Sequence, residues 1–162
     1  MTEPTHLAAT RESYDTVAAD YAERVPALFA DDRLGRAMLA AFAEHVLDDD
    51  GPVADALDLP DGSLRGIVAW WSIVHTPPSE LPGVFAEFHR TLAPGGHVIM
   101  GFHVGDERRR PEKSFGHPVS YDSYRLAPDH IAELLGEAGL VVIARLLSDE
   151  RRLPQACMLA RK

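Results

Sequence analysis

The chain has 162 residues, of which 46% are hydrophobic and 25% charged, a composition typical of a globular domain. Its formal net charge of −9 disfavours nucleic acid as a partner, because neutralising phosphates requires clustered Lys and Arg. No apolar stretch reaches the ~18 residues of a membrane span, no signal-peptide pattern opens the sequence, and a single cysteine, Cys157, excludes an internal disulfide. We therefore predict one cytoplasmic domain over residues 1–162 that has no membrane partner.

Two amphipathic helices are predicted at the start of the chain. Apolar and aromatic residues recur at spacings of three and four from Tyr14 to Val25, and Pro26 should end this helix. A second stripe with the same spacing runs from Leu34 to Val46 and predicts the next helix.

Predicted strands and helices alternate along the rest of the sequence. After a short stub at residues 53–55, the elements expected in order are a two-sided apolar strand at 67–74, a helix at 81–92, a buried strand at 97–102, a helix from 128 to 139, and strands at 140–147 and 156–160. Strands that alternate with helices in this way predict an α/β fold.

A polar segment at residues 105–125 interrupts this alternation. It shows no periodicity and is too long for a simple connector, which favours a functional loop. It contains the only basic run, Arg108-Arg109-Arg110, which is either a solvated stretch or a clamp for an acidic substrate.

The stub at residues 53–55 resembles the first strand of a nucleotide-binding sheet, but the expected turn does not follow it. A loop at residues 56–63 comes next, and no G-x-G-x-x-G or Walker motif follows any predicted strand. Such a turn needs glycine so that the backbone can approach the ligand closely.

Two motifs carry a resemblance to a known family. The segment Leu59-Pro60-Asp61-Gly62-Ser63-Leu64, through Ile73-Val74-His75, resembles the fourth-strand region of class I S-adenosylmethionine-dependent methyltransferases. The match continues through Phe85-Ala86-Glu87-Phe88-His89-Arg90-Thr91-Leu92-Ala93-Pro94-Gly95-Gly96 into the fifth strand. Residues 14–21 also look like the lid helix of that family, and residues 137–140 like the end of its C-terminal helix.

The resemblance implies a Rossmann-like methyltransferase sheet with helices on both faces. The sheet is truncated, with its first strand a stub and its second and third strands absent. The resemblance divides the chain into lid helices at 1–50, the remaining core sheet at 51–104, a substrate-cover loop at 105–127, and a C-terminal helix and strand pair at 128–162. It implies methyl transfer from S-adenosylmethionine to an O, N or C atom of a small molecule.

The absent elements amount to two β-α units, roughly 40–50 residues. Either a complete form carries them, or the chain is a deleted form that cannot hold the cofactor in the family's manner. The alternative function is a non-catalytic binding or dimerisation protein on a truncated methyltransferase scaffold. Because the deletion leaves the strand at 67–74 near an open edge, we expect a homodimer, which can be domain-swapped.

Two histidines are candidate catalytic residues. His75 follows the strand predicted at 67–74, and His103 follows the next strand, at the ends where open α/β sheets bind ligands. A histidine there can act as a general base or orient an acceptor hydroxyl, and the alternative is a loop or capping residue.

Five residues are candidates for cofactor binding. The resemblance places Tyr14 and Tyr21 across the cofactor, although simple burial of their shared helix face also explains them. It also gives a cofactor role to Asp55, at the end of the stub. Trp70 and Trp71 are adjacent in the predicted strand and should face opposite sides, so that one is a core residue and the other can stack on a ligand.

The loop supplies the candidate substrate contacts, His117, Tyr121, Tyr124 and Arg125. No metal site is predicted, because no histidines have i, i+4 spacing and no Cys partner or H-E-x-x-H motif is present.

Overall fold

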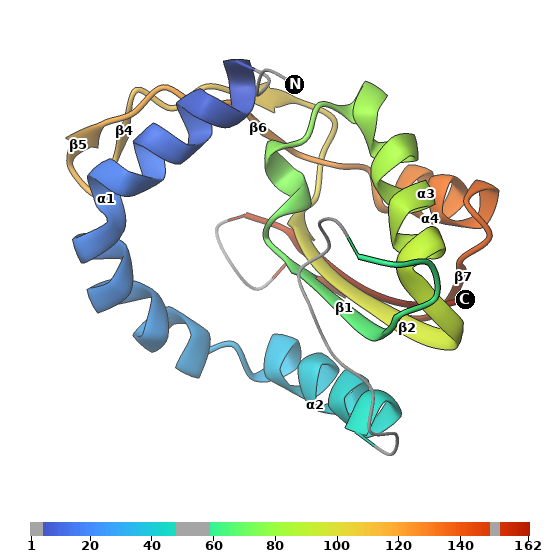
Figure 1. The fold of residues 1–162 in the computed structure, drawn as a ribbon. Helices are drawn as coiled ribbons and strands as arrows, with labels where there is room; N and C mark the ends of the chain where they lie inside the picture. Colours follow the sequence, from blue (N-terminus) through green and yellow to red (C-terminus); the bar gives the residue numbers. More distant parts are fainter. Residues whose placement is uncertain (1–4, 48–58, 150–152) are drawn as a thin grey trace.

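The computed structural model describes residues 5–47, 59–149 and 153–162. Its centre is a four-stranded sheet in the order β1-β2-β8-β7, shown in Figure 1. The strands are β1 (Leu64–Trp70), β2 (Leu92–His103), β7 (Val141–Ser148) and β8 (Gln155–Arg161). Strands β1 and β2 are parallel, whereas β8 is antiparallel to both β2 and β7.

Helices cover both faces of this sheet, which confirms the predicted class of truncated, Rossmann-like α/β fold. Alternate residues of β2 point to opposite faces, with Val98 and Met100 in one buried cluster and Ile99 in the other. The first cluster includes α3 (Leu81–Thr91) and α4 (Pro128–Glu137), and the second includes α2 (Arg33–Leu47). Among the described residues, no strand pairs with the outer edge of β1, as expected.

The strand predicted at 67–74 ends earlier, at Trp70. Trp71 has a φ of 57°, a left-handed conformation that no strand continues through, and its N–H donates to the carbonyl of Gly101. Two 3₁₀ turns follow, η1 (Ile73–His75) and η2 (Pro78–Glu80). The prediction that Trp70 and Trp71 share a strand and face opposite sides is therefore wrong for Trp71.

The first helix also differs from its prediction. Helix α1 (Thr5–Ala30) continues through Pro26 instead of ending there. Proline has a φ compatible with a helix, and it removes only one N–H from the backbone hydrogen-bond pattern. In Figure 1, α1 runs along the side of the molecule opposite α3 and α4, and no helix of the described residues is long and apolar enough to cross a membrane.

The loop at 105–127 has secondary structure of its own. Strand β3 (Arg108–Arg109) pairs with β6 (Ser123–Tyr124), and β4 (Lys113–Ser114) pairs with β5 (His117–Pro118). These ladders are too short to produce periodicity in the sequence. The predicted stub at 53–55, with Asp55, lies outside the described residues.

Candidate functional site

The carboxyl ends of β1 and β2 lie at the same end of the sheet because the two strands are parallel. Trp70 and Trp71 lie at the end of β1, His103 ends β2, and Gln155 pairs with His103 across the sheet. The ring centroids of Trp71 and His103 are 4.9 Å apart. Open α/β sheets bind their ligands at this end, so these side chains form one wall of a candidate site.

The imidazole of His103 has a buried nitrogen without a hydrogen-bond partner among the described residues. Its Nδ1 atom is buried and makes no hydrogen bond within the described part of the chain. Burial lowers the pKa of His103, and the nearby charge of Arg125 lowers it further. The imidazole is therefore neutral at pH 7, and its Nδ1 is able to donate or accept a hydrogen bond, depending on the tautomer.

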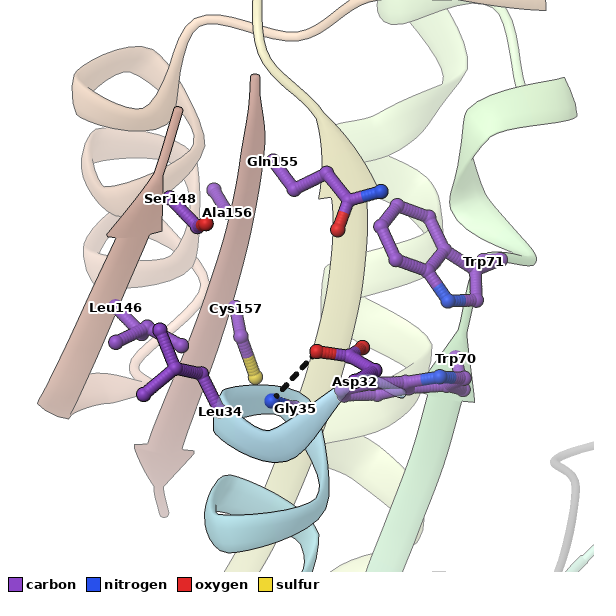
Figure 2. A pocket seen from close by; sticks show the side chains of 10 residues that line it. All are labelled: Asp32, Leu34, Gly35, Trp70, Trp71, Leu146, Ser148, Gln155, Ala156 and Cys157. Atoms are coloured by element: carbon purple, nitrogen blue, oxygen red, sulfur yellow. Dashed lines mark hydrogen bonds between the residues drawn. The ribbon is translucent and has the colours of Figure 1, made fainter. Parts of the chain in front are cut away.

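Two small cavities flank the tryptophans. Figure 2 shows the smaller one, with a volume of about 20 Å³, where Asp32 accepts a hydrogen bond from the Gly35 N–H and caps the start of α2. Cys157 lines it, and burial raises the pKa of this thiol to about 12, which excludes a reactive thiolate at neutral pH. The second cavity, about 260 Å³, is lined by Tyr21, Trp70, Trp71 and His103, with Val25, Phe29, Asp32 and Gln155.

A larger cavity of about 580 Å³ is also lined by His103. Its described wall combines residues of the loop with His103 at the end of β2 and Leu153 just before β8: His103, Arg109, Arg110, Pro111, Tyr121, Ser123, Arg125 and Leu153. Sites for small molecules in proteins usually have volumes of about 300–1,000 Å³. This cavity is therefore large enough for an organic substrate.

His75 is held from both sides. Its Nδ1 lies 2.9 Å from the carbonyl oxygen of Asp122, which can only accept, so Nδ1 carries the proton. In the neutral ring, Nε2 then accepts a hydrogen bond from the Tyr14 hydroxyl at 3.0 Å. Burial lowers the pKa of His75, although the bond to Asp122 opposes this shift. Burial, followed by the charges of Tyr21 and Tyr121, raises the pKa of Tyr14 to about 12.

Several residue pairs join α1 to the loop, and we call four of them the clasp: Ser13 with the backbone N–H of Ser120, Tyr14 with Tyr121, Asp20 with His117, and Tyr21 with Phe115. The Ser120 N–H donates to Ser13 Oγ at 3.0 Å, and His117 Nε2 lies 2.8 Å from Asp20 Oδ2. The two aromatic pairs have ring centroids 6.0 Å apart. His75 contacts both partners, through Tyr14 of α1 and through Tyr121 and Asp122 of the loop.

The structure brings most of the predicted site residues into two groups. Tyr14, Tyr21, His75 and Tyr121 form one aromatic cluster. Tyr121 also lines the 580 Å³ cavity together with His103 and Arg125. His117 is bound to α1, and Tyr124 packs against the main core, so neither lines that cavity.

Several residues of the site were not predicted from the sequence. Asp122 fixes His75 through its carbonyl oxygen, and its carboxylate accepts hydrogen bonds from Arg108 and Arg110. These two arginines lower the pKa of Asp122 to about 2. Gln155 was also missed, and its only signal is a polar residue at the start of an otherwise apolar strand. In the described part of the chain, no group of three or more His, Cys, Asp or Glu residues is placed to hold a metal ion.

The comparisons with known proteins concern the fold. No protein-family model and no curated protein matches the sequence. An S-adenosylmethionine-dependent methyltransferase from Methanosarcina mazei matches with a TM-score of 0.58 and 13% identity, over 66% of this chain and 63% of its own. The 1,6-didemethyltoxoflavin-N1-methyltransferase of Burkholderia thailandensis matches with a TM-score of 0.52 and 20% identity, over 65% and 46%.

A third structure, the [4+2]-cyclase SpnF, matches with a TM-score of 0.50 and 18% identity, over 66% of this chain and 53% of its own. The chain therefore has a class I methyltransferase-like fold and spans less than two thirds of the length of these structures. Because a cyclase is among the matches, the fold by itself does not determine the reaction.

The cofactor implied by this fold needs a glycine-rich turn after the first strand. Gly62 is the only glycine between Asp55 and β1. It has a φ of 63°, and its N–H donates to the carbonyl of Arg90, so it shapes the turn into β1. The aromatic rings of Tyr21, Trp70 and Trp71 can contact an adenosyl group, but the residues present do not fit S-adenosylmethionine in the family's manner.

Proposed function

We propose that this chain provides the acceptor side of an S-adenosylmethionine-dependent methyltransferase and binds a small molecule in the 580 Å³ cavity. The observation that carries the proposal is the position of this cavity beside His103, at the carboxyl end of a parallel strand pair. The methyltransferase part of the proposal is supported by the fold shared with the Methanosarcina and Burkholderia enzymes.

The residues around His75 can orient an acceptor. His75 Nε2 is an acceptor atom held in place by the bond from Nδ1 to Asp122, and it faces the phenol of Tyr14. An acceptor hydroxyl that replaced the Tyr14 hydroxyl would donate to the same atom, and His75 could then orient it or remove its proton. Tyr121 lies beside His75, with ring centroids 5.1 Å apart, and also lines the cavity, so the cluster adjoins the bound molecule.

We expect the 162-residue chain to bind the acceptor without turning it over. Methyl transfer needs the cofactor held in line with the acceptor, and the sequence contains no glycine-rich turn to hold it. A second copy of the same chain cannot supply this turn either, because it has the same sequence. A homodimer would therefore extend the sheet without restoring the cofactor site.

A second candidate function is methyl transfer by the chain itself, with the cofactor bound in a different manner. It is favoured by the 260 Å³ cavity, whose aromatic side chains Tyr21, Trp70 and Trp71 can stack on an adenosyl group or contact a sulfonium cation.

Titration calorimetry with S-adenosylmethionine and S-adenosylhomocysteine separates the two candidates. We expect a Kd weaker than about 100 μM for both compounds, since the turn that allows close backbone approach is absent. A low-micromolar Kd that is lost in Trp71→Ala and retained in Trp70→Phe would favour the second candidate. It would also show that the glycine turn is not needed.

A further inference from the structure

We propose that the 580 Å³ cavity binds a small aromatic carboxylate through Arg109, Arg110 and Arg125. Resting on the function proposed above, this carboxylate is the methyl acceptor. Three of the eight described residues that line the cavity are arginines, and none of these eight is a carboxylate. The whole chain has a net charge of −9, so a concentration of guanidinium groups in one cavity runs against its overall charge.

The arginines outnumber the carboxylates that hold them. Asp122 accepts hydrogen bonds from Arg108 at 2.6 Å and from Arg110 at 3.0 and 3.2 Å. Glu107 accepts a hydrogen bond from Arg125 at 2.5 Å and lies 3.7 Å from Arg109. Four guanidinium groups therefore share two carboxylates, which leaves two positive charges uncompensated within this group. The other charged residues of the loop, Asp106, Glu112 and Lys113, do not line the cavity.

These ion pairs leave donors available for a ligand. A guanidinium group has five N–H donors, and the bonds to Asp122 use the Nε and Nη2 atoms of Arg110. The contact between Arg109 and Glu107 is long, and the Arg109 side chain is 57% exposed. Arg125 is held more firmly, because its side chain also packs against Gly105. Arginine binds a carboxylate through two parallel hydrogen bonds, so a carboxylate matches this geometry well.

The rest of the cavity wall suits an aromatic body. Tyr121, Pro111 and Leu153 supply apolar surface, and Ser123 supplies a polar contact. Tyr121 connects this wall to His75, so a hydroxyl on the far side of the ring would lie toward the His75 cluster. The matched ligand is therefore a benzoate-type molecule with a second polar substituent.

The test compares two probes of nearly the same size, 4-hydroxybenzoate and its neutral amide 4-hydroxybenzamide, by calorimetry with the full 162-residue chain and no cofactor. We expect the carboxylate to bind at least about tenfold more tightly than the amide, because only the carboxylate forms charge-assisted bonds. Arg109→Gln should weaken binding of the carboxylate about five- to twentyfold and leave binding of the amide unchanged. Arg36→Gln, an equal change of charge on the exposed face of α2, is the matched control and should change neither affinity.

Several results would overturn the proposal. These are equal affinities for the two probes, an Arg109→Gln variant that binds the carboxylate normally, equal losses in Arg109→Gln and Arg36→Gln, or no binding of the carboxylate at about 10 mM. Circular dichroism of each variant shows whether a loss comes from unfolding, and Arg110→Gln provides a second variant. If the carboxylate binds as expected but S-adenosylmethionine binds with a low-micromolar Kd, the carboxylate site stands and only the proposal that the chain provides the acceptor side alone fails.

Discussion

Replacing Gly66 with alanine tests how α2 packs on the sheet. A Cβ atom at Gly66 would lie 2.7 Å from Phe42 Cζ and 2.9 and 3.1 Å from the two γ-methyl groups of Val46. Such overpacking of a core costs about 1–3 kcal/mol, whereas removing a glycine from a strand returns about 0.5–1 kcal/mol. We therefore expect Gly66→Ala to lower the free energy of unfolding by about 0.5–2 kcal/mol, measured by urea denaturation and circular dichroism.

Gly83→Ala is the matched control. Gly83 lies in α3, and a Cβ atom there would have no atom within 4 Å, so the same substitution should stabilise the protein by about 0.5 kcal/mol. In the double variant Gly66→Ala/Phe42→Leu, the shorter side chain removes the Cζ contact, and the combined loss should be smaller than the sum of the single losses. If Gly66→Ala is as stable as Gly83→Ala, α2 does not pack on β1 as described.

Three further predictions concern assembly, acidity and the clasp. Both faces of β1 are covered within the chain, so the expected homodimer would form through backbone pairing at the edge of β1. This dimer should be weak, with a Kd in the range of hundreds of micromolar. Sedimentation that shows only monomer up to about 1 mM would contradict the prediction. Burial lowers the pKa values of His75, His97 and His103, so the unfolded chain takes up protons first. The free energy of unfolding should be constant above about pH 7 and fall as the pH drops below about 6.5, by at most about 1.4 kcal/mol per pH unit for each histidine. Urea unfolding measures this dependence, and a free energy of unfolding that does not change between about pH 7.5 and 5.5 would contradict the prediction. Tyr14→Phe removes the bond to His75 and should speed hydrogen exchange in α1 about fivefold, for a loss of about 1 kcal/mol; Tyr21→Phe keeps every contact described here and should leave exchange unchanged.

The sequence predicted the elements whose side chains show a regular period. The stripe from Leu34 to Val46 became α2, and the apolar runs at 97–102 and 156–160 became the centres of β2 and β8. The end of β1 was not predictable, because the apolar run continues past Trp71, and no residue type in the run marks the left-handed φ of Trp71. A continuous apolar run predicts that its residues are buried, but it does not predict their backbone conformation.

The candidate site was predicted only in part, for a similar reason. His75 and His103 follow strands, and that position can be inferred from local sequence. The hydrogen bond between Tyr14 and His75 joins residues that are 61 positions apart in the sequence. The arginines of the 580 Å³ cavity are placed by the β3-β6 ladder, whose strands have two residues each. Asp122 holds His75 through a backbone carbonyl, which every residue type has, so the sequence contains no signal for it.

The length of α1 gives the clasp a mechanical consequence. With 26 residues at 1.5 Å each, α1 is a rod about 39 Å long. The clasp contacts lie between residues 13 and 21 of α1, and Asp31 and Asp32 connect the other end of α1 to α2 (Figure 1). Because α1 is continuous between these points, it joins the loop that lines the 580 Å³ cavity to the start of α2, where Asp32 borders both cavities beside Trp70 and Trp71. Pro26 lies between the clasp and the far end of α1 and removes one N–H from the helical hydrogen-bond pattern, so it marks the weakest point of this connection.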